Sequence, residues 1–218
     1  MAGDLTTFMA RLDKDADAIR PYAEFEKLPS FGNRLMVELA AYTAAAHIAL
    51  RAEGLPEYEA RVAVADTGWE IYRKMLGWAA LPARVMTRDP GRRLRWTIRL
   101  LLKFPFGATG APGYAVRAWR DGDDIQTHFT HCPPQSFVRR LSEAKDDPAI
   151  LEAFFDSWCR YDWPGADLIA GDGERGHYAR AHTLSRGDSV CDMCWKKVGD
   201  RARLSGGQGI GDVRQARG

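Results

Sequence analysis

The chain has 218 residues, of which 45% are hydrophobic and 28% are charged, and both fractions are ordinary for a globular protein. This length suits one domain with a core of normal size. The formal net charge of +2 gives no sign of a nucleic-acid partner. The sequence shows no signal peptide and no apolar run long enough to span a bilayer, so we expect a cytoplasmic protein without a membrane partner.

The first half of the sequence is expected to be helical. Apolar residues recur there at spacings of three and four, which is the pattern of a helix with one buried face. Asn33 is a candidate N-terminal cap, and Gly54 is a candidate stop signal for the same helix. The patterns predict helices over residues 3–21, 33–54, 56–80 and 90–104.

The second half changes character at the turn-rich segment GATGAPG, residues 107–113. Segments 114–120 and 124–132 are predicted to be strands of a hairpin that turns at DGDD, and 177–184 and 189–197 are predicted to form a second hairpin. Helices are expected over 136–144 and 148–163.

The fold class is therefore α+β, within a single domain over residues 1–197. A helical part, 1–106, is followed by a sheet part, 107–197, with about four antiparallel strands and inserted helices. Residues 198–218 are rich in Gly and Arg, and we expect them to form a flexible tail.

The segment RGDSVCDMCWKK, residues 186–197, places Cys191 and Cys194 in a Cys-x-x-Cys spacing. Side chains alternate along a strand, so Cys191 would lie on one face and Cys194 on the other. A four-thiolate zinc site would also need a second Cys-x-x-Cys, which the sequence lacks. We therefore predict that these two thiols do not act as a pair.

Cys132 ends the predicted strand 124–132, where alternation places it on the face of His128 and Thr130. It also precedes a helix, whose N-terminus favours a thiolate, so the position suits a reactive cysteine. The alternative is that Cys132 is simply a small buried residue.

Two further pairings are candidates for a site. Cys159 and Asp162 lie three residues apart on the predicted helix 148–163 and would meet at its end, although Cys159 would equally suit the core. His182 lies on the strand expected to pair with that of Cys191, where it would act as a base to a thiol or pack in the sheet.

Three segments in this order, HFTHCPPQ, FFDSWCRYDW and RAHTLSRGDSVCDMCW, resemble the L-2-amino-thiazoline-4-carboxylic acid hydrolase family. The resemblance covers roughly residues 30–197. Met193 and Pro134 stand where that family commonly has aromatic residues, and Cys194 has no counterpart. A more distant resemblance, to 4-vinyl reductase-type small-molecule-binding domains, implies binding without chemistry. The matching positions are Cys132, Pro133, Cys159, Asp162, His182, Thr183, Gly187, Asp188, Cys191 and Asp192.

The resemblance implies hydrolysis of a small cyclic amidine or amide, or a related C–N or C–S substrate. Such a reaction needs a nucleophile, a base, a proton donor and a cationic group for a substrate carboxylate. In this hypothesis the nucleophile is one of Cys132, Cys159 and Cys191, and no cofactor is needed. The supporting residues would be His182 or His128 as base, Asp162, Asp188 or Asp192 to orient it, and Arg180 or Arg186 to hold the substrate.

Two alternatives use the same three cysteines. As ligands from separate elements, Cys132, Cys159 and Cys191 would hold a catalytic zinc ion with an open coordination position. As lining of an apolar pocket with Trp158 and Trp195, they would belong to a non-catalytic small-molecule-binding domain. Each hypothesis has a small molecule as the partner, and none fixes the oligomeric state.

Overall fold

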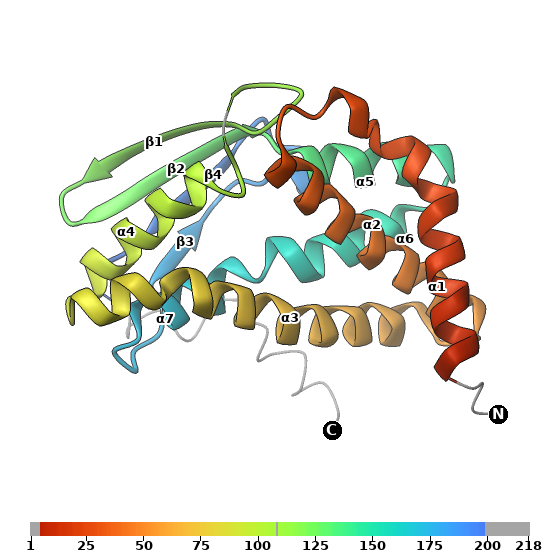
Figure 1. The fold of residues 1–218 in the computed structure, drawn as a ribbon, viewed down its shortest axis with the longest axis horizontal. Helices are drawn as coiled ribbons and strands as arrows, with labels where there is room; N and C mark the ends of the chain where they lie inside the picture. The colour runs from red at the N-terminus through yellow and green to blue at the C-terminus, as the bar shows by residue number, and fades with distance from the viewer. Residues whose placement is uncertain (1–4, 108, 199–218) are drawn as a thin grey trace.

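A computed structural model describes residues 5–107 and 109–198, so the predicted tail lies outside the described residues except for Val198. The α+β fold class is confirmed: helices fill the first half of the chain, and an antiparallel sheet with inserted helices follows (Figure 1). Within the described ranges, no helix has the length and apolar character that crossing a bilayer requires.

The first half consists of four α-helices and two short 3₁₀ turns. The side chain of Ser30 accepts a hydrogen bond from the Asn33 N–H at 3.1 Å, so α2 begins earlier than predicted, and Ser30 rather than Asn33 is its cap. Helix α3 continues past the predicted end at residue 80, with Pro82 inside it, because its last turns pack against α4 and α7. The elements are α1 (Leu5–Ile19), η1 (Arg20–Ala23), η2 (Phe25–Lys27), α2 (Phe31–Ala52), α3 (Glu57–Met86) and α4 (Pro90–Lys103).

The sheet has four antiparallel strands in the order β1-β2-β4-β3. The first hairpin turns at Gly122, as predicted, with a left-handed φ of 59°. The strands are β1 (Ala115–Asp121), β2 (Asp124–His131), β3 (Tyr178–Arg180) and β4 (Cys191–Trp195).

The predicted second hairpin is wrong in its length, because β3 ends at Arg180 and the chain leaves the sheet until β4. A 3₁₀ turn, η4 (Leu184–Arg186), lies in this loop. The Asp188 carboxylate accepts a hydrogen bond from the Thr183 N–H at 2.7 Å, and the Asp192 carboxylate accepts one from the His182 N–H at 2.7 Å. Side chains therefore satisfy backbone groups that a longer hairpin would have paired.

The predicted helix 148–163 is broken into three pieces. Pro164 lacks the N–H that a continuous helix would need to bond to the Arg160 carbonyl, and it suits the first turn of a new helix instead. Asp162 therefore begins a helix, whereas Cys159 ends the π-helical segment before it. The helices of the second half are α5 (Pro133–Ala144), α6 (Pro148–Phe154), the π-helical segment η3 (Phe155–Cys159) and α7 (Asp162–Ala170).

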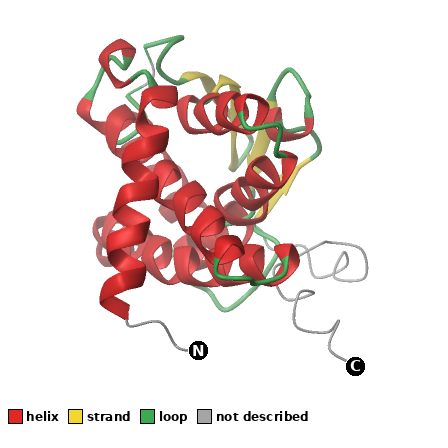
Figure 2. Ribbon diagram, turned by 90° about the vertical axis from the view of Figure 1, so that its right-hand side faces the viewer, coloured by secondary structure: helices red, strands yellow, loops and turns green. Residues whose placement is uncertain are grey.

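The sheet occupies one side of the molecule and helices make up the rest (Figure 2). One hydrophobic cluster joins α1, α2, α5 and α6, including Val37, Phe137 and Ile150. A second joins α3, α4 and α7 to the sheet, and includes Leu76 and Trp195. A third, smaller cluster connects α2 to the sheet between them.

Candidate functional site

A mainly apolar cavity lies between the inner face of the sheet and helices α2, α3, α4 and α6. Its volume is about 100 Å³. The apolar part of its wall includes Met36, Tyr72, Leu102, Phe129, Trp158 and Met193.

The three cysteines of the predicted cluster all line this cavity, although they are distant in sequence. Cys132 is the N-cap of α5, Cys159 is the last residue of η3, and Cys191 is the first residue of β4. The register of β2 and β4 places Cys191 opposite Phe129, which lines the same cavity. The three thiols therefore reach the same cavity from the end of a strand, the end of a π-helical segment and the end of a loop.

The predicted facing of Cys132 is wrong, because it lines the cavity together with Phe129 and not on the face of His128. Val116 pairs with Phe129 whereas Ala115 pairs with His131, so β2 carries one extra residue, Thr130, in this interval. Such a bulge shifts the alternation of side chains by one position. Simple alternation would place Cys132 on the face opposite to Phe129, and the bulge places it on the same face as Phe129.

Burial keeps all three thiols in their neutral form. It raises the pKa of Cys132 well above its usual range, despite the adjacent helix N-terminus, and raises the pKa of Cys159 to about 12. The pKa of Cys191 is also raised by burial, while the Leu184 N–H donates to its Sγ at 3.2 Å. Since the thiolate is the nucleophilic form, burial disfavours the reactive form of each of these thiols.

Asp162 and Arg180 also line the cavity, and they form a charge pair with little exposure, since the two side chains are 16% and 3% exposed. The Tyr178 hydroxyl donates to Asp162 Oδ2 at 3.2 Å, and the Arg180 guanidinium donates to the same oxygen at 3.5 Å. Arg180 also lies 4.7 Å from the ring centroid of Trp163. Both contacts fall on Oδ2, and among the described residues Asp162 Oδ1 has no hydrogen-bond partner.

Burial raises the pKa of Asp162 to about 6, because the charge of Arg180 and the Tyr178 hydrogen bond offset only part of the desolvation. A carboxyl group with this pKa exchanges its proton close to neutral pH, which suits general acid–base catalysis. Tyr178 was not among the predicted site residues. The signal was present, since Tyr178 and Arg180 lie two residues apart on a strand and therefore share a face.

His182, Asp188 and Asp192 do not line the cavity. His182 is not on a strand, and its side chain is 58% exposed, with Nδ1 2.7 Å from Asp192 Oδ2. That hydrogen bond raises the pKa of His182. His182 and Asp192 thus bond to each other, while Asp188 and Asp192 accept hydrogen bonds from backbone N–H groups of the loop between β3 and β4.

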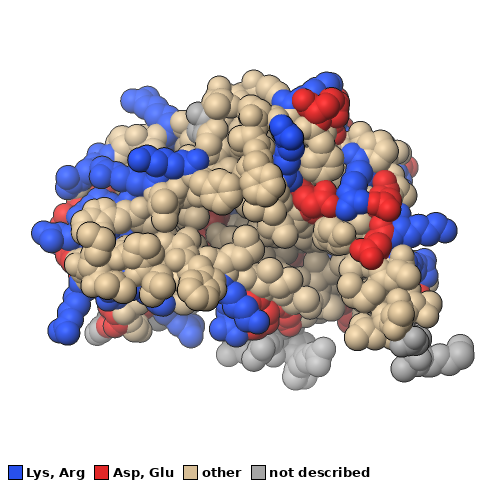
Figure 3. Space-filling model, viewed as in Figure 1, with Lys and Arg blue, Asp and Glu red and all other residues tan. Residues whose placement is uncertain are grey.

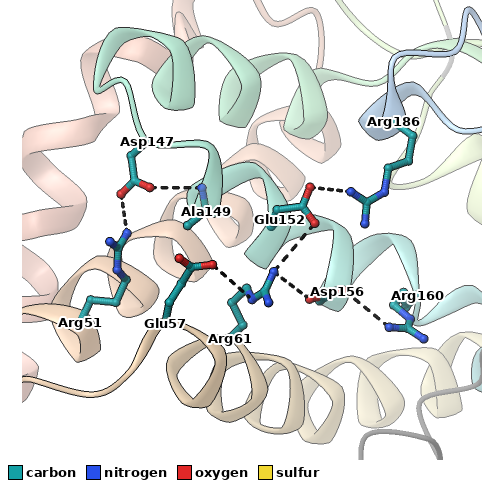
Figure 4. A network of polar contacts seen from close by, with 9 residues as sticks. All are labelled: Arg51, Glu57, Arg61, Asp147, Ala149, Glu152, Asp156, Arg160 and Arg186. Atoms are coloured by element: carbon teal, nitrogen blue, oxygen red, sulfur yellow. Dashed lines mark hydrogen bonds and ion pairs between the residues drawn. The ribbon is translucent and has the colours of Figure 1, made fainter.

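Arg186 and His128 also lie away from the cavity. Arg186 pairs with Glu152 at 2.5 Å in a network of ion pairs that links the loop to α6 and α3 (Figure 4). Its guanidinium lies 3.9 Å from the ring centroid of Phe155. His128 is on the other face of the sheet, 4.6 Å from the ring of Trp119.

The prediction that Cys191 and Cys194 lie on opposite faces of their strand is confirmed. Cys191 faces the cavity, whereas Cys194 receives a hydrogen bond from the Gln126 side chain at 3.2 Å and does not line it. Across residues 5–107 and 109–198, no group of three or more His, Cys, Asp or Glu side chains is arranged to hold a metal ion. The arrangement of the three thiols therefore does not fit the zinc alternative.

Comparisons with protein-family models, with curated proteins and with solved structures found no match to this chain. The fold and the cavity together define an α+β protein with a mainly apolar cavity, lined by one carboxyl group whose pKa is raised. Its function is therefore inferred from this site.

Proposed function

We propose that the chain hydrolyses a C–N bond in a small ring compound that carries a carboxylate, with Asp162 as the group that moves protons. The observation that carries this proposal is the pair of Asp162 and Arg180 on the wall of an otherwise apolar cavity. Of the residues that line the cavity none is a histidine, so Asp162 is its base. Its Oδ1 atom, which has no hydrogen-bond partner within the described part of the chain, is the proposed position for a water molecule.

Arg180 supplies the group that would hold a substrate carboxylate. A guanidinium has five N–H donors, and the hydrogen bond to Asp162 uses one of them. The buried setting strengthens a further charge-assisted hydrogen bond, because competing water is excluded. The apolar wall would then contact the ring of the substrate.

In the proposed reaction, Asp162 takes a proton from a water molecule while the oxygen of that water bonds to the carbon of an amidine C=N group. The C–N bond breaks as both protons of the water pass to the ring nitrogen. The carbon keeps the oxygen as a carbonyl, and Asp162 returns to its carboxylate form. The three thiols serve as neutral wall groups, since no base other than Asp162 lines the cavity to deprotonate them.

The test is turnover of a panel of cyclic amidines and amides, including 2-amino-thiazoline-4-carboxylate, by matched variants. We expect Asp162→Asn to lower kcat about a hundredfold or more. Cys132→Ala, Cys159→Ala and Cys191→Ala should keep most of the turnover, and Cys194→Ala serves as the control outside the cavity. Full activity of Asp162→Asn on a confirmed substrate would exclude this role, and loss in one cavity cysteine variant alone would restore the thiol nucleophile.

A second candidate is a binding domain without chemistry. It is supported by the neutral state of the thiols and by the largely apolar wall around Trp158 and Trp195. Ligands from the same panel would change the fluorescence of these two tryptophans. Saturable binding without turnover of any compound would favour this candidate over the hydrolase.

A further inference from the structure

The outer face of α3 and α4, opposite the cavity, carries large apolar side chains in contact with solvent. On α3 they follow helical spacing along a length of roughly 20 Å, since each residue adds about 1.5 Å. Trp78 and Val85 are 76% and 79% exposed. We call this surface the α3–α4 face and define it by Ile71, Met75, Trp78, Val85, Trp96 and Leu100.

A shallow groove between α3 and α4 joins their exposed apolar side chains into one continuous surface. Pro82 and Met86 of α3 line it together with Trp96 and Leu100 of α4. At the end of α4, the exposed ring of Phe104 stacks on that of Phe31, with centroids 6.5 Å apart. Exposed apolar patches of this extent on a folded protein typically mark a binding surface.

The same segment carries a local excess of positive charge. Residues 70–104 contain nine Lys or Arg and two Asp or Glu, a net charge of +7, whereas the whole chain carries +2 and the remainder therefore carries −5. Figure 3 shows many blue and few red side chains around the tan surface on the left, where α4 and the end of α3 lie below the β1–β2 hairpin in Figure 1.

Much of this charge is not neutralised by neighbours. Arg73 pairs with Glu70, and Arg95 contacts Asp123. Five other basic residues are exposed and form no ion pair with any described residue, namely Lys74, Arg88, Arg92, Arg99 and Lys103. The partner of this face must therefore accept both apolar side chains and uncompensated positive charge.

From this combination, we propose that the α3–α4 face binds the surface of an anionic lipid bilayer. Tryptophan and aliphatic side chains enter the boundary between headgroups and acyl chains, while Arg and Lys contact anionic headgroups. A second copy of the chain is a poorer partner, because a twofold interface would bring two faces of +7 together. The expectation of no membrane partner rested on the lack of a spanning segment, which surface binding does not need.

The test is co-sedimentation of the full chain with phosphatidylcholine vesicles, with and without a one-third share of phosphatidylglycerol. We expect binding to the anionic vesicles, weaker at high salt, and little binding to phosphatidylcholine alone. The double variants Trp78→Gln/Val85→Gln and Arg92→Glu/Arg99→Glu should each lose about tenfold or more in affinity. Both alter exposed residues, so their thermal unfolding should match that of the wild type.

Lys14→Glu/Lys145→Glu is the matched control, because it changes the net charge equally at exposed positions on α1 and after α5. It should bind anionic vesicles nearly as the wild type does. Equal loss in this control, or undiminished binding by Trp78→Gln/Val85→Gln, would overturn the proposal in favour of a general charge effect. A dimer in sedimentation velocity that Trp78→Gln/Val85→Gln dissociates, without vesicle binding, would overturn it in favour of a second copy.

Discussion

Asp162 and His47 are both ionisable side chains with little or no exposed surface, but their surroundings differ. Asp162 lines the cavity and receives hydrogen bonds from Tyr178 and Arg180. His47, on α2, has no exposed surface, and neither ring nitrogen has a partner among the described residues. Burial moves each toward its neutral form, raising the pKa of Asp162 to about 6 and lowering that of His47 to about 4. Burial alone therefore does not mark a site; contact with the cavity and a buried counter-charge do.

The charges near His47 explain why it stays neutral. Arg51 and Arg61 disfavour its protonated form, whereas Asp147 and Glu57 favour it, and all four effects are smaller than that of burial. These groups pair with one another across α2, α3 and α6 (Figure 4). His47 is thus an uncharged core residue beside a network that is already balanced.

The largest expected effect follows from removing the counter-charge of Asp162. Arg180→Leu should lower the free energy of unfolding by about 4 kcal/mol at pH 8, because it leaves a buried carboxylate unpaired. The loss should be smaller at pH 5, where Asp162 is protonated. Urea unfolding at both pH values measures this. Arg117→Leu, at an exposed position on β1, is the control and should change stability by less than about 0.5 kcal/mol. Equal loss at both pH values would mean that Arg180 acts through packing alone.

The two buried groups should contribute opposite pH dependences. The folded state keeps the Asp162 proton that the unfolded chain releases, so its contribution to the free energy of unfolding falls as pH rises from about 4 to 6. As pH decreases, His47 is protonated in the unfolded chain before it is protonated in the folded chain. The contribution of His47 to the free energy of unfolding therefore falls as pH decreases from 6.5 to about 4. Each amounts to roughly 3 kcal/mol, since one pKa unit is about 1.4 kcal/mol.

These contributions should largely cancel in the wild type and separate in single variants. Stability should fall with rising pH between about 4 and 6 in His47→Leu, and rise over this range in Asp162→Asn. Urea unfolding across the range gives the three profiles. Parallel profiles for the two variants would contradict the opposed shifts.

Two buried histidines offer a comparison at constant pH. His177, also without exposed surface, has Nδ1 2.9 Å from the Lys196 carbonyl and Nε2 3.1 Å from Asp172 Oδ1. At pH 8, His47→Leu should raise the free energy of unfolding by about 1 kcal/mol by removing unpaired polar atoms, whereas His177→Leu should lower it by about 2 kcal/mol. Thermal unfolding distinguishes them, and destabilisation by both would show that His47 has an unrecognised partner.

The sequence predicts those parts of the fold that local patterns control. Helical periodicity locates α1 to α4, and the Asp-Gly turn locates the first hairpin. It fails where one residue changes the local geometry: Pro164 restarts a helix, and the extra residue Thr130 turns Cys132 toward the cavity. The loop after β3 was missed because Asp188 and Asp192 replace ladder hydrogen bonds with side-chain ones.

Within the candidate site, the structure brings together five of the predicted residues. Cys132, Cys159, Cys191, Asp162 and Arg180 line one cavity. Arg186 and His182 lie elsewhere because their positions in the loop depend on partners that no sequence pattern specifies, Glu152 and Asp192. His128 lies elsewhere because it is on the other face of β2, beside Trp119. The charge of the α3–α4 face was hidden for another reason, since acidic residues elsewhere cancel it in the total.

The smallest expected effects compare the two cysteines of the Cys-x-x-Cys segment. Cys191→Ala should lower the free energy of unfolding by about 1 kcal/mol, because the Leu184 N–H loses its buried acceptor. Cys194→Ala should change it by less than about 0.5 kcal/mol, since Cys194 is partly exposed and its partner Gln126 can bond to water. Urea unfolding of both variants under reducing conditions measures the difference. Equal and large losses in both would contradict the separation of the thiols by strand alternation, and with it the assignment of only Cys191 to the cavity.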